Sequence, residues 1–168
     1  MIVARADELR LENILARTEC IIAIGEGELH GDALACALHS DYFVMRDDVV
    51  IIIDTPRAWS GVIWRIGSRA LRLLANGTRL PARDAHQQGL CDEVVARGSD
   101  PVEWLAGRSV PALDSAASLI ARRGGDALER AEFARLFATG EPQRGLTAFL
   151  GKRKGIIDES GRNRNHRD

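Results

Sequence analysis

The stretch Cys20–Asp41, CIIAIGEGELHGDALACALHSD, decides the fold of this chain. A short β-branched run, Cys20–Ile24, ends at glycines and predicts a buried strand. The residues that follow, His30–His39, carry apolar or small side chains on nearly every side, which predicts a buried central helix. A glycine turn that opens a helix leaves backbone N–H groups free to hold an anion or a developing oxyanion. The stretch therefore predicts a strand, a turn and a helix, with a candidate anion site at the turn.

The whole chain has the composition of one globular domain. Its 168 residues are 45% hydrophobic and 28% charged, which is enough for a core and unlike a disordered segment. The formal net charge of −1 gives no global attraction to nucleic acid or to an anionic membrane, so we expect neither as a partner. No apolar stretch approaches the roughly 20 residues of a membrane span. The N-terminus lacks the apolar core of a secretory signal, and we expect a cytoplasmic protein.

Cysteine and histidine patterns indicate no metal site. Cys20, Cys36 and Cys91 lie in apolar or helical contexts without CxxC spacing, so we expect buried free thiols in a reducing compartment. The four histidines are scattered, and no pair has the spacing of metal ligands. We therefore expect neither a metal nor a resident cofactor.

The order of predicted elements indicates an α/β core with a helical C-terminal extension. Residues 6–16 have helix-like spacing, and a helix is also expected to start at Asp100-Pro101. The remaining predicted strands are Tyr42–Met45, Val49–Ile53 and Leu90–Val95. The remaining predicted helices are Ile63–Leu74 with a break at Gly67, Pro81–Gln88, Leu113–Arg123 and Asp126–Ala138 with an apolar stripe.

Three patterns in order carry a resemblance to a known family. The first is the strand, glycine turn and helix that end at Asp41. The second is RIGSRALRLLANGTRLPARDAHQQGLCDEVV, Arg65–Val95, and the third is ERAEFARLFATGEPQRGLTAFLGKRK, Glu129–Lys154. From about Cys20 to Lys154 the chain resembles the crotonase (enoyl-CoA hydratase/isomerase) superfamily.

The resemblance implies an α/β fold of the ClpP/crotonase type, with a spiral β-β-α core and a helical C-terminal extension. It divides the chain into a shortened core over residues 1–100, a helical trimerisation region over 101–155 and a flexible basic tail over 156–168. It also implies a homotrimer or hexamer that binds an acyl-CoA thioester as substrate or ligand. The basic triplet Lys152, Arg153 and Lys154 falls on the family's Lys-Arg motif and either meets the phosphates of coenzyme A or belongs to a solvated tail.

Family members stabilise an enolate oxygen with two backbone N–H groups. By resemblance, the second donor lies at Gly31 and Asp32, and the first comes from a segment earlier in the chain. Only about twenty residues precede Cys20, where family members usually carry several more strands, and the segment of the first donor has no evident counterpart. At the turn, the alternative to an oxyanion site is an ordinary helix start in which Asp32 complements the helix dipole.

The two glutamates of the hydratases are missing from this sequence. Counting along the family pattern places Ala35 at the first position and Thr55 at the second, with Asp54 one residue away. The loop that follows is shortened to PRAWSG, Pro56–Gly61. Hydration needs paired carboxylates to position water and to move protons, so we expect weak or absent hydratase activity.

Two classes of function remain open from the sequence. One is an acyl-CoA-processing enzyme that acts through enolate stabilisation, with Asp54 as a surviving acid or base. The other is a non-catalytic accessory subunit with the same fold that binds and supports a partner enzyme. In the second class, Asp54-Thr55-Pro56 is ordinary turn chemistry.

Overall fold

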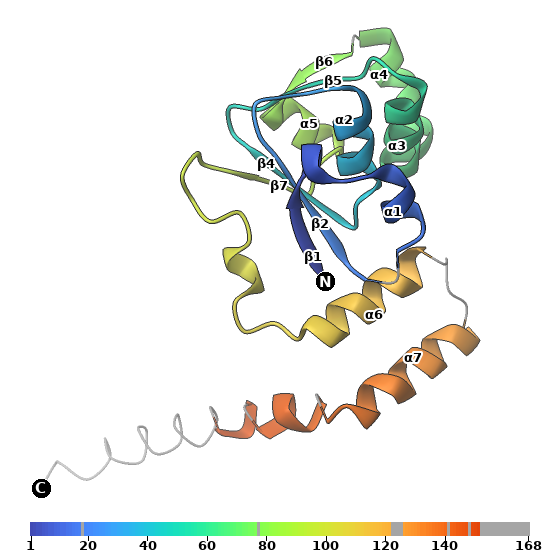
Figure 1. The fold of residues 1–168 in the computed structure, drawn as a ribbon, viewed down its shortest axis with the longest axis vertical. Coiled ribbons are helices and arrows are strands. Elements are labelled where there is room, and N and C mark those ends of the chain that lie inside the picture. Colours follow the sequence, from blue (N-terminus) through green and yellow to red (C-terminus); the bar gives the residue numbers. More distant parts are fainter. Residues whose placement is uncertain (18, 77, 122–125, 141, 148, 152–168) are drawn as a thin grey trace, which may run out of the picture. The chain divides into compact units, whose positions relative to one another are not determined.

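The computed structural model describes the chain except for residues 18, 77, 122–125, 141, 148 and 152–168 (Figure 1). It divides into two compact units, Met1–Ala121 and Arg122–Asp168. The basic triplet that begins at Lys152 and the predicted tail over 156–168 lie outside the described residues. The predicted trimerisation region stays a prediction.

Two sheets form the framework of the first unit. The parallel sheet has the order β1 (Ile2–Arg5), β2 (Ile21–Gly25), β4 (Tyr42–Arg46), β7 (Glu93–Val95). The second sheet has the order β3 (Glu28–Leu29), β5 (Val50–Ile52), β6 (Arg79–Pro81), in which β3 and β5 are parallel and β6 is antiparallel. At β2-β3 and again at β4-β5, the chain passes from a strand of the first sheet to one of the second and then to a helix, which is the spiral β-β-α repeat expected from the resemblance.

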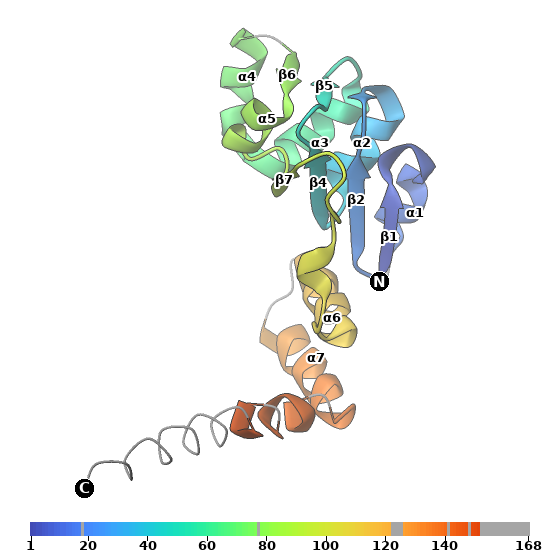
Figure 2. The same cartoon turned by 90° about the vertical axis from the view of Figure 1, so that its left-hand side faces the viewer.

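Helices follow each pair of strands and cover the sheets (Figure 2). The first unit contains α1 (Leu11–Leu15), α2 (Gly31–His39), α3 (Pro56–Ile66), α4 (Ala70–Asn76), α5 (Ala82–Gln88) and α6 (Val110–Ala121). The described residues of this unit also form three single turns of 3-10 helix: η1 (Ala6–Glu8) before α1, η2 (Gly67–Arg69) between α3 and α4, and η3 (Glu103–Leu105) before α6. The helix α2 packs against α3, β2, β5 and η1, so it is the central helix of the unit.

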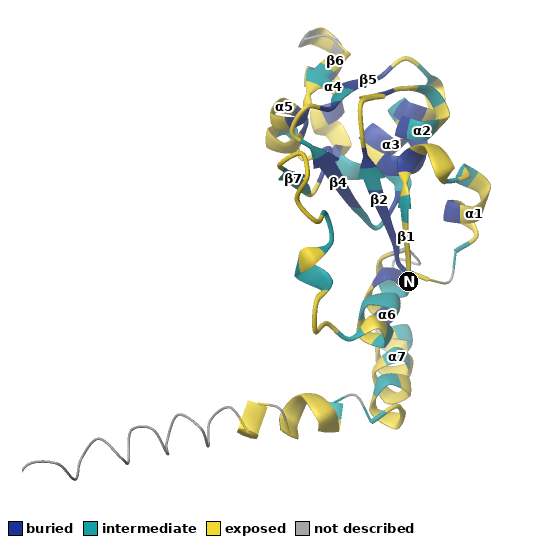
Figure 3. Ribbon diagram, turned by 60° about the vertical axis from the view of Figure 1, so that its left-hand side comes forward, coloured by how far each residue is buried: buried dark blue, intermediate teal, exposed yellow. Residues whose placement is uncertain are grey.

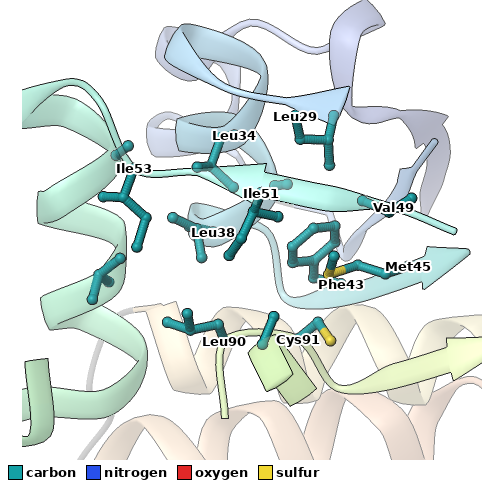
Figure 4. Close-up of a cluster of buried hydrophobic side chains, with 14 of the residues drawn as sticks. Leu29, Leu34, Leu38, Phe43, Met45, Val49, Ile51, Ile53, Leu90 and Cys91 are labelled. Atoms are coloured by element: carbon teal, nitrogen blue, oxygen red, sulfur yellow. The ribbon is translucent and has the colours of Figure 1, made fainter. Parts of the chain in front are cut away.

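Alternation of side chains along β2 and β4 divides the core between the two faces of the parallel sheet. On one face, Ala23, Phe43 and Met45 join the main cluster with α2 and α3 (Figure 4). On the other face, Ile22 and Val44 pack with Ala117 of α6 and with part-buried residues of the η3 region. Both faces of these strands are buried (Figure 3), as is usual for a parallel sheet covered on both sides.

The strand and helix of the opening stretch are confirmed to within one residue at each end. The prediction for residues 6–16 was wrong in part, because a strand, Ile2–Arg5, and η1 precede a helix of only five residues. The helix expected at Asp100-Pro101 is instead a turn followed by η3, and the next helix begins at Val110. The segment before Cys20 thus contains the strand β1 and the 3-10 turn η1, where only a helix was predicted.

The predicted loop Pro56–Gly61 is the first half of helix α3. Thr55 Oγ1 accepts a hydrogen bond from the backbone N–H of Ala58 at 3.2 Å, and Pro56 occupies the first helical position. A threonine cap followed by proline is a strong local signal for a helix start. The helix therefore begins seven residues earlier than the predicted Ile63.

The second unit contains α7 (Asp126–Ala138). The rings of Phe133 and Phe137 contact each other with centroids 4.5 Å apart. Both side chains are nevertheless exposed, so the predicted apolar stripe of this helix is not buried in the described residues.

Candidate functional site

The backbone N–H of the glycine turn before α2 is already bonded to a carboxylate of the same chain. Gly31 has φ +55°, a left-handed conformation that residues with a Cβ rarely adopt. Its backbone N–H donates a hydrogen bond of 2.9 Å to Asp54 Oδ1. The predicted donor therefore has an anionic acceptor in this structure.

The topology of the second sheet brings these two residues together. β3 and β5 are parallel neighbours, with Leu29 paired to Ile51. The carboxyl ends of the two strands therefore lie at the same edge of the sheet, so that the turn after β3 faces Asp54 after β5. The imidazole Nδ1 of His30 lies 3.6 Å from Asp54 Oδ2, which adds a second group beside the same carboxylate.

The site is open to solvent. The side chain of His30 is 61% exposed and that of Asp54 is 41% exposed. Charges at such a surface interact in a high dielectric, so hydrogen bonds and ion pairs there are weak compared with those in an excluded pocket. The turn therefore lacks the enclosure that makes an oxyanion site strongly stabilising.

Asp32 does not contact the Gly31 amide in the described interactions but pairs with helix α3. Arg57 Nη1 lies 3.2 Å from Asp32 Oδ1, with both side chains largely exposed. Asp32 also lies in the first turn of α2, where an acid complements the positive end of the helix. Its negative charge is therefore partly compensated by Arg57.

The two positions expected for catalytic glutamates have structural roles here. Ala35 is completely buried in α2. The hydroxyl of Thr55 caps α3. Among the predicted site residues that the structure describes, Asp54 is thus the one carboxylate at the Gly31 amide, and no carboxylate pair is assembled from these positions.

Asp41, at the end of the opening stretch, forms a buried ion pair that the sequence did not reveal. Its carboxylate accepts hydrogen bonds from Arg17 Nε at 3.0 Å and Arg17 Nη2 at 2.7 Å. It also accepts one from the backbone N–H of Ile21 at 2.8 Å, and Arg17 donates to the Ile14 carbonyl. Asp41 therefore ties the end of α2 to the start of β2, which is a structural role.

The three thiols are buried and unsuited to nucleophilic chemistry. Burial raises the pKa of Cys20 to about 11 and that of Cys91 to about 12, and it also raises the pKa of Cys36. The thiolate is the reactive form, so a raised pKa suppresses reaction near neutral pH. In the part of the chain that the structure describes, no group of three His, Cys, Asp or Glu side chains could hold a metal ion.

A separate groove of about 380 Å³ lies on the first unit between β1, η1 and α1. Its lining includes Ile2, Ala4, Arg10 and Ile14. It contains neither Gly31 nor Asp54, so the hollow on this surface is distinct from the glycine turn.

No family model matches the chain, and no curated protein matches it. Solved structures do. An enoyl-CoA hydratase/isomerase family member has a TM-score of 0.71 at 23% identity, over 84% of this chain and 60% of that chain. An enoyl-CoA hydratase/isomerase from Cupriavidus metallidurans has a TM-score of 0.69 at 23% identity, over 84% and 62% of the two chains. An enoyl-CoA hydratase from Polaromonas sp. has a TM-score of 0.67 at 26% identity, over 84% and 63%.

These structures confirm the predicted crotonase fold. The chain has the α/β fold of the enoyl-CoA hydratase/isomerase structures, and it spans 60–63% of the length of those three. In the described residues, no helix combines the length and the apolar character that crossing a membrane requires.

Proposed function

We propose that this chain is a non-catalytic protein with the crotonase fold, an accessory subunit that binds and supports a partner enzyme. The observation that carries the proposal is the 2.9 Å hydrogen bond from the Gly31 N–H to Asp54 Oδ1. A carboxylate is a stronger acceptor than a thioester carbonyl, because bonds to ionised acceptors are about twice as strong as neutral ones. A thioester oxygen could therefore bind the Gly31 N–H only by displacing the Asp54 carboxylate.

The charge of Asp54 also opposes the chemistry of an enolate. A developing negative charge at the Gly31 amide would lie beside an existing one, and like charges at such distances repel. The proposal further includes a cytoplasmic location, expected from the N-terminal sequence and the cysteine pattern, and a homotrimeric or hexameric assembly, implied by the sequence resemblance.

A second candidate is an acyl-CoA enzyme that works by enolate stabilisation. The observation that favours it is the 3.6 Å approach of His30 Nδ1 to Asp54 Oδ2, because an imidazole and a carboxylate side by side can move a proton. In this candidate, Asp54 leaves the amide when the thioester binds and acts as acid or base. η1, which packs against α2, is then the earlier segment available for the first donor.

Replacing Asp54 by alanine separates the two candidates. For the accessory protein, we expect no stabilisation of the wild type by crotonyl-CoA in a thermal-shift assay. The Asp54→Ala variant gains a measurable shift, because its Gly31 amide is free. For the enzyme, the wild type turns over crotonyl-CoA and Asp54→Ala does not. Asp48→Ala is the matched control, since Asp48 is likewise an exposed acid in a side-chain pair, with Arg97 at 3.3 Å in place of His30.

A further inference from the structure

The strand β1 is a free edge of the parallel sheet. It is the first strand in the order β1-β2-β4-β7 and pairs only with β2 in the described sheet (Figure 2). The side chains of Ile2 and Val3 are 43% and 39% exposed. An exposed apolar edge with unpaired backbone groups is a template for another strand.

The hydrogen bonds of β1 show which backbone groups face outward. The Ile2 N–H donates to the Cys20 carbonyl at 2.8 Å, so Ile2 faces β2. In a parallel ladder the backbone groups of successive residues alternate in direction, so those of Val3 and Arg5 face away from β2. The Arg5 N–H is covered by Glu8 Oε2 at 3.3 Å. Val3 is therefore left with an outward N–H and an outward C=O.

The groove of about 380 Å³ lies directly beside this edge. Ile2 and Ala4 of β1 form part of its floor, and α1 contributes Ile14. A strand that pairs with β1 would place every second side chain on the same face of the sheet as Ile2 and Ala4. One apolar side chain of that strand would then enter the groove.

The groove lining holds two acids, Glu8 and Glu19, and two arginines, Arg10 and Arg17. Glu8 accepts a hydrogen bond from the Arg5 N–H, and Glu19 lies 3.7 Å from the Met1 ammonium. Arg10 is therefore the charge that indicates the chemistry of the occupant. Arg10 lines the groove and is exposed. No ion pair involves its guanidinium among the described residues, whereas the other arginine of the lining, Arg17, is held by Asp41. An acidic residue on the incoming strand would complement Arg10.

We propose that the β1 edge binds an extended segment of a partner polypeptide that carries alternating apolar residues and an acidic residue. The proposal deepens the proposed accessory function by identifying the surface that a partner uses, and it rests on that function. The segment pairs with the Val3 backbone, fills the groove with an apolar side chain and places its carboxylate at Arg10. A second copy of β1 is a poorer occupant, because its sequence IVAR contains no acid.

The test uses the whole chain and a fluorescein-labelled peptide, acetyl-TVTVTETVT-amide, followed by anisotropy; its glutamate lies on the same face of the strand as the valines, so that both can reach the groove. We expect saturable binding that is lost when alternate amides of the peptide are N-methylated, because those amides can no longer pair with the edge. Equal binding of the methylated peptide, or no binding of either, overturns the proposal. This comparison alters the probe, so it does not depend on how a variant folds.

Two protein variants locate the binding. Val3→Pro removes the outward N–H without breaking a bond to β2, a position where sheets tolerate proline, and we expect about tenfold weaker binding. Arg10→Glu weakens binding of the glutamate peptide about fivefold, and a peptide with lysine in place of glutamate restores it. Unchanged binding by both variants overturns the proposal.

The same samples show whether a second copy of the chain covers the β1 edge. They also distinguish failure of the docking proposal from failure of the accessory function. A dimer in light scattering that Val3→Pro converts to monomer would show that a second copy covers the edge, and it overturns the proposal. Turnover of crotonyl-CoA by the wild type would refute the accessory function and leave the peptide result unaffected. Failure of the peptide test removes only the docking surface.

Discussion

Replacing Asp41 by asparagine tests whether the opening stretch is held by a buried charge. Asparagine keeps the shape of the side chain and one oxygen for the Ile21 N–H, but it removes the negative charge. The Arg17 guanidinium, 10% exposed beside a carboxylate that is 5% exposed, is then left buried without its counterion. Removing one partner of a buried pair costs about 3–5 kcal/mol.

The Coulomb energy between the two charges is of the same magnitude as this loss of stability. Two unit charges about 4 Å apart at an effective dielectric of about 20 interact by about 4 kcal/mol. With a urea slope of about 2 kcal/mol per molar, we expect the unfolding midpoint of Asp41→Asn to fall by about 2 M. Urea unfolding followed by circular dichroism measures this shift.

Asp32→Asn is the matched control, because Asp32 also pairs with an arginine but at an exposed position. We expect a loss of at most about 1 kcal/mol there. The double variant Arg17→Met/Asp41→Asn removes both buried charges and should recover much of the stability that Asp41→Asn loses. Equal midpoint shifts for the two single variants would refute the reasoning.

Three further outcomes follow from burial and packing. Because burial raises their pKa values, the cysteines should take up no iodoacetamide at pH 8 in the native protein and three labels in urea, counted by mass spectrometry. Burial and the charges of Arg17 and Arg65 lower the pKa of His39 below its ordinary 6.5. Its stabilising contribution is therefore present above about pH 6.5 and lost as the pH falls through the folded pKa, and His39→Gln should flatten this part of the stability profile. In Gly61→Ala the new Cβ would lie 2.5 Å from the Leu38 Cβ. The overpacking costs about 1–3 kcal/mol, which should exceed the gain of about 1 kcal/mol in helix propensity and lower the Tm. A rise in Tm would contradict the close approach of α2 and α3.

Local signals predicted the centre of the fold well. The β-branched run at Cys20–Ile24 predicts a buried strand, and the small and apolar residues of His30–His39 predict a buried helix. Both elements are present. The strand Ile2–Arg5 was missed because four residues, three of them exposed at a sheet edge, carry no periodic signal. The start of α3 could have been found from Thr55-Pro56, but the family comparison favoured a loop there.

The site could be predicted only in part, because its contacts join residues distant in sequence. Sequence reasoning identified Gly31 and Asp54 as candidates from separate patterns. Only the parallel pairing of β3 with β5 brings the amide to the carboxylate. The pairs Asp32–Arg57 and Asp41–Arg17 are likewise tertiary contacts, which no local spacing indicates.

In the proposed accessory protein, the Gly31 N–H is occupied by the Asp54 carboxylate and the site lacks the carboxylate pair of a hydratase. The most direct test is the rate at which the wild-type chain hydrates crotonyl-CoA. The reaction is followed by the loss of absorbance of the conjugated thioester, at high protein concentration. We expect a rate no greater than that of buffer, and the same for Asp54→Ala, because the predicted glutamate positions, Ala35 and Thr55, supply no carboxylate pair to position water in either protein. Turnover by the wild type that disappears in Asp54→Ala, with Asp48→Ala unaffected, would contradict this and establish Asp54 as an acid or base.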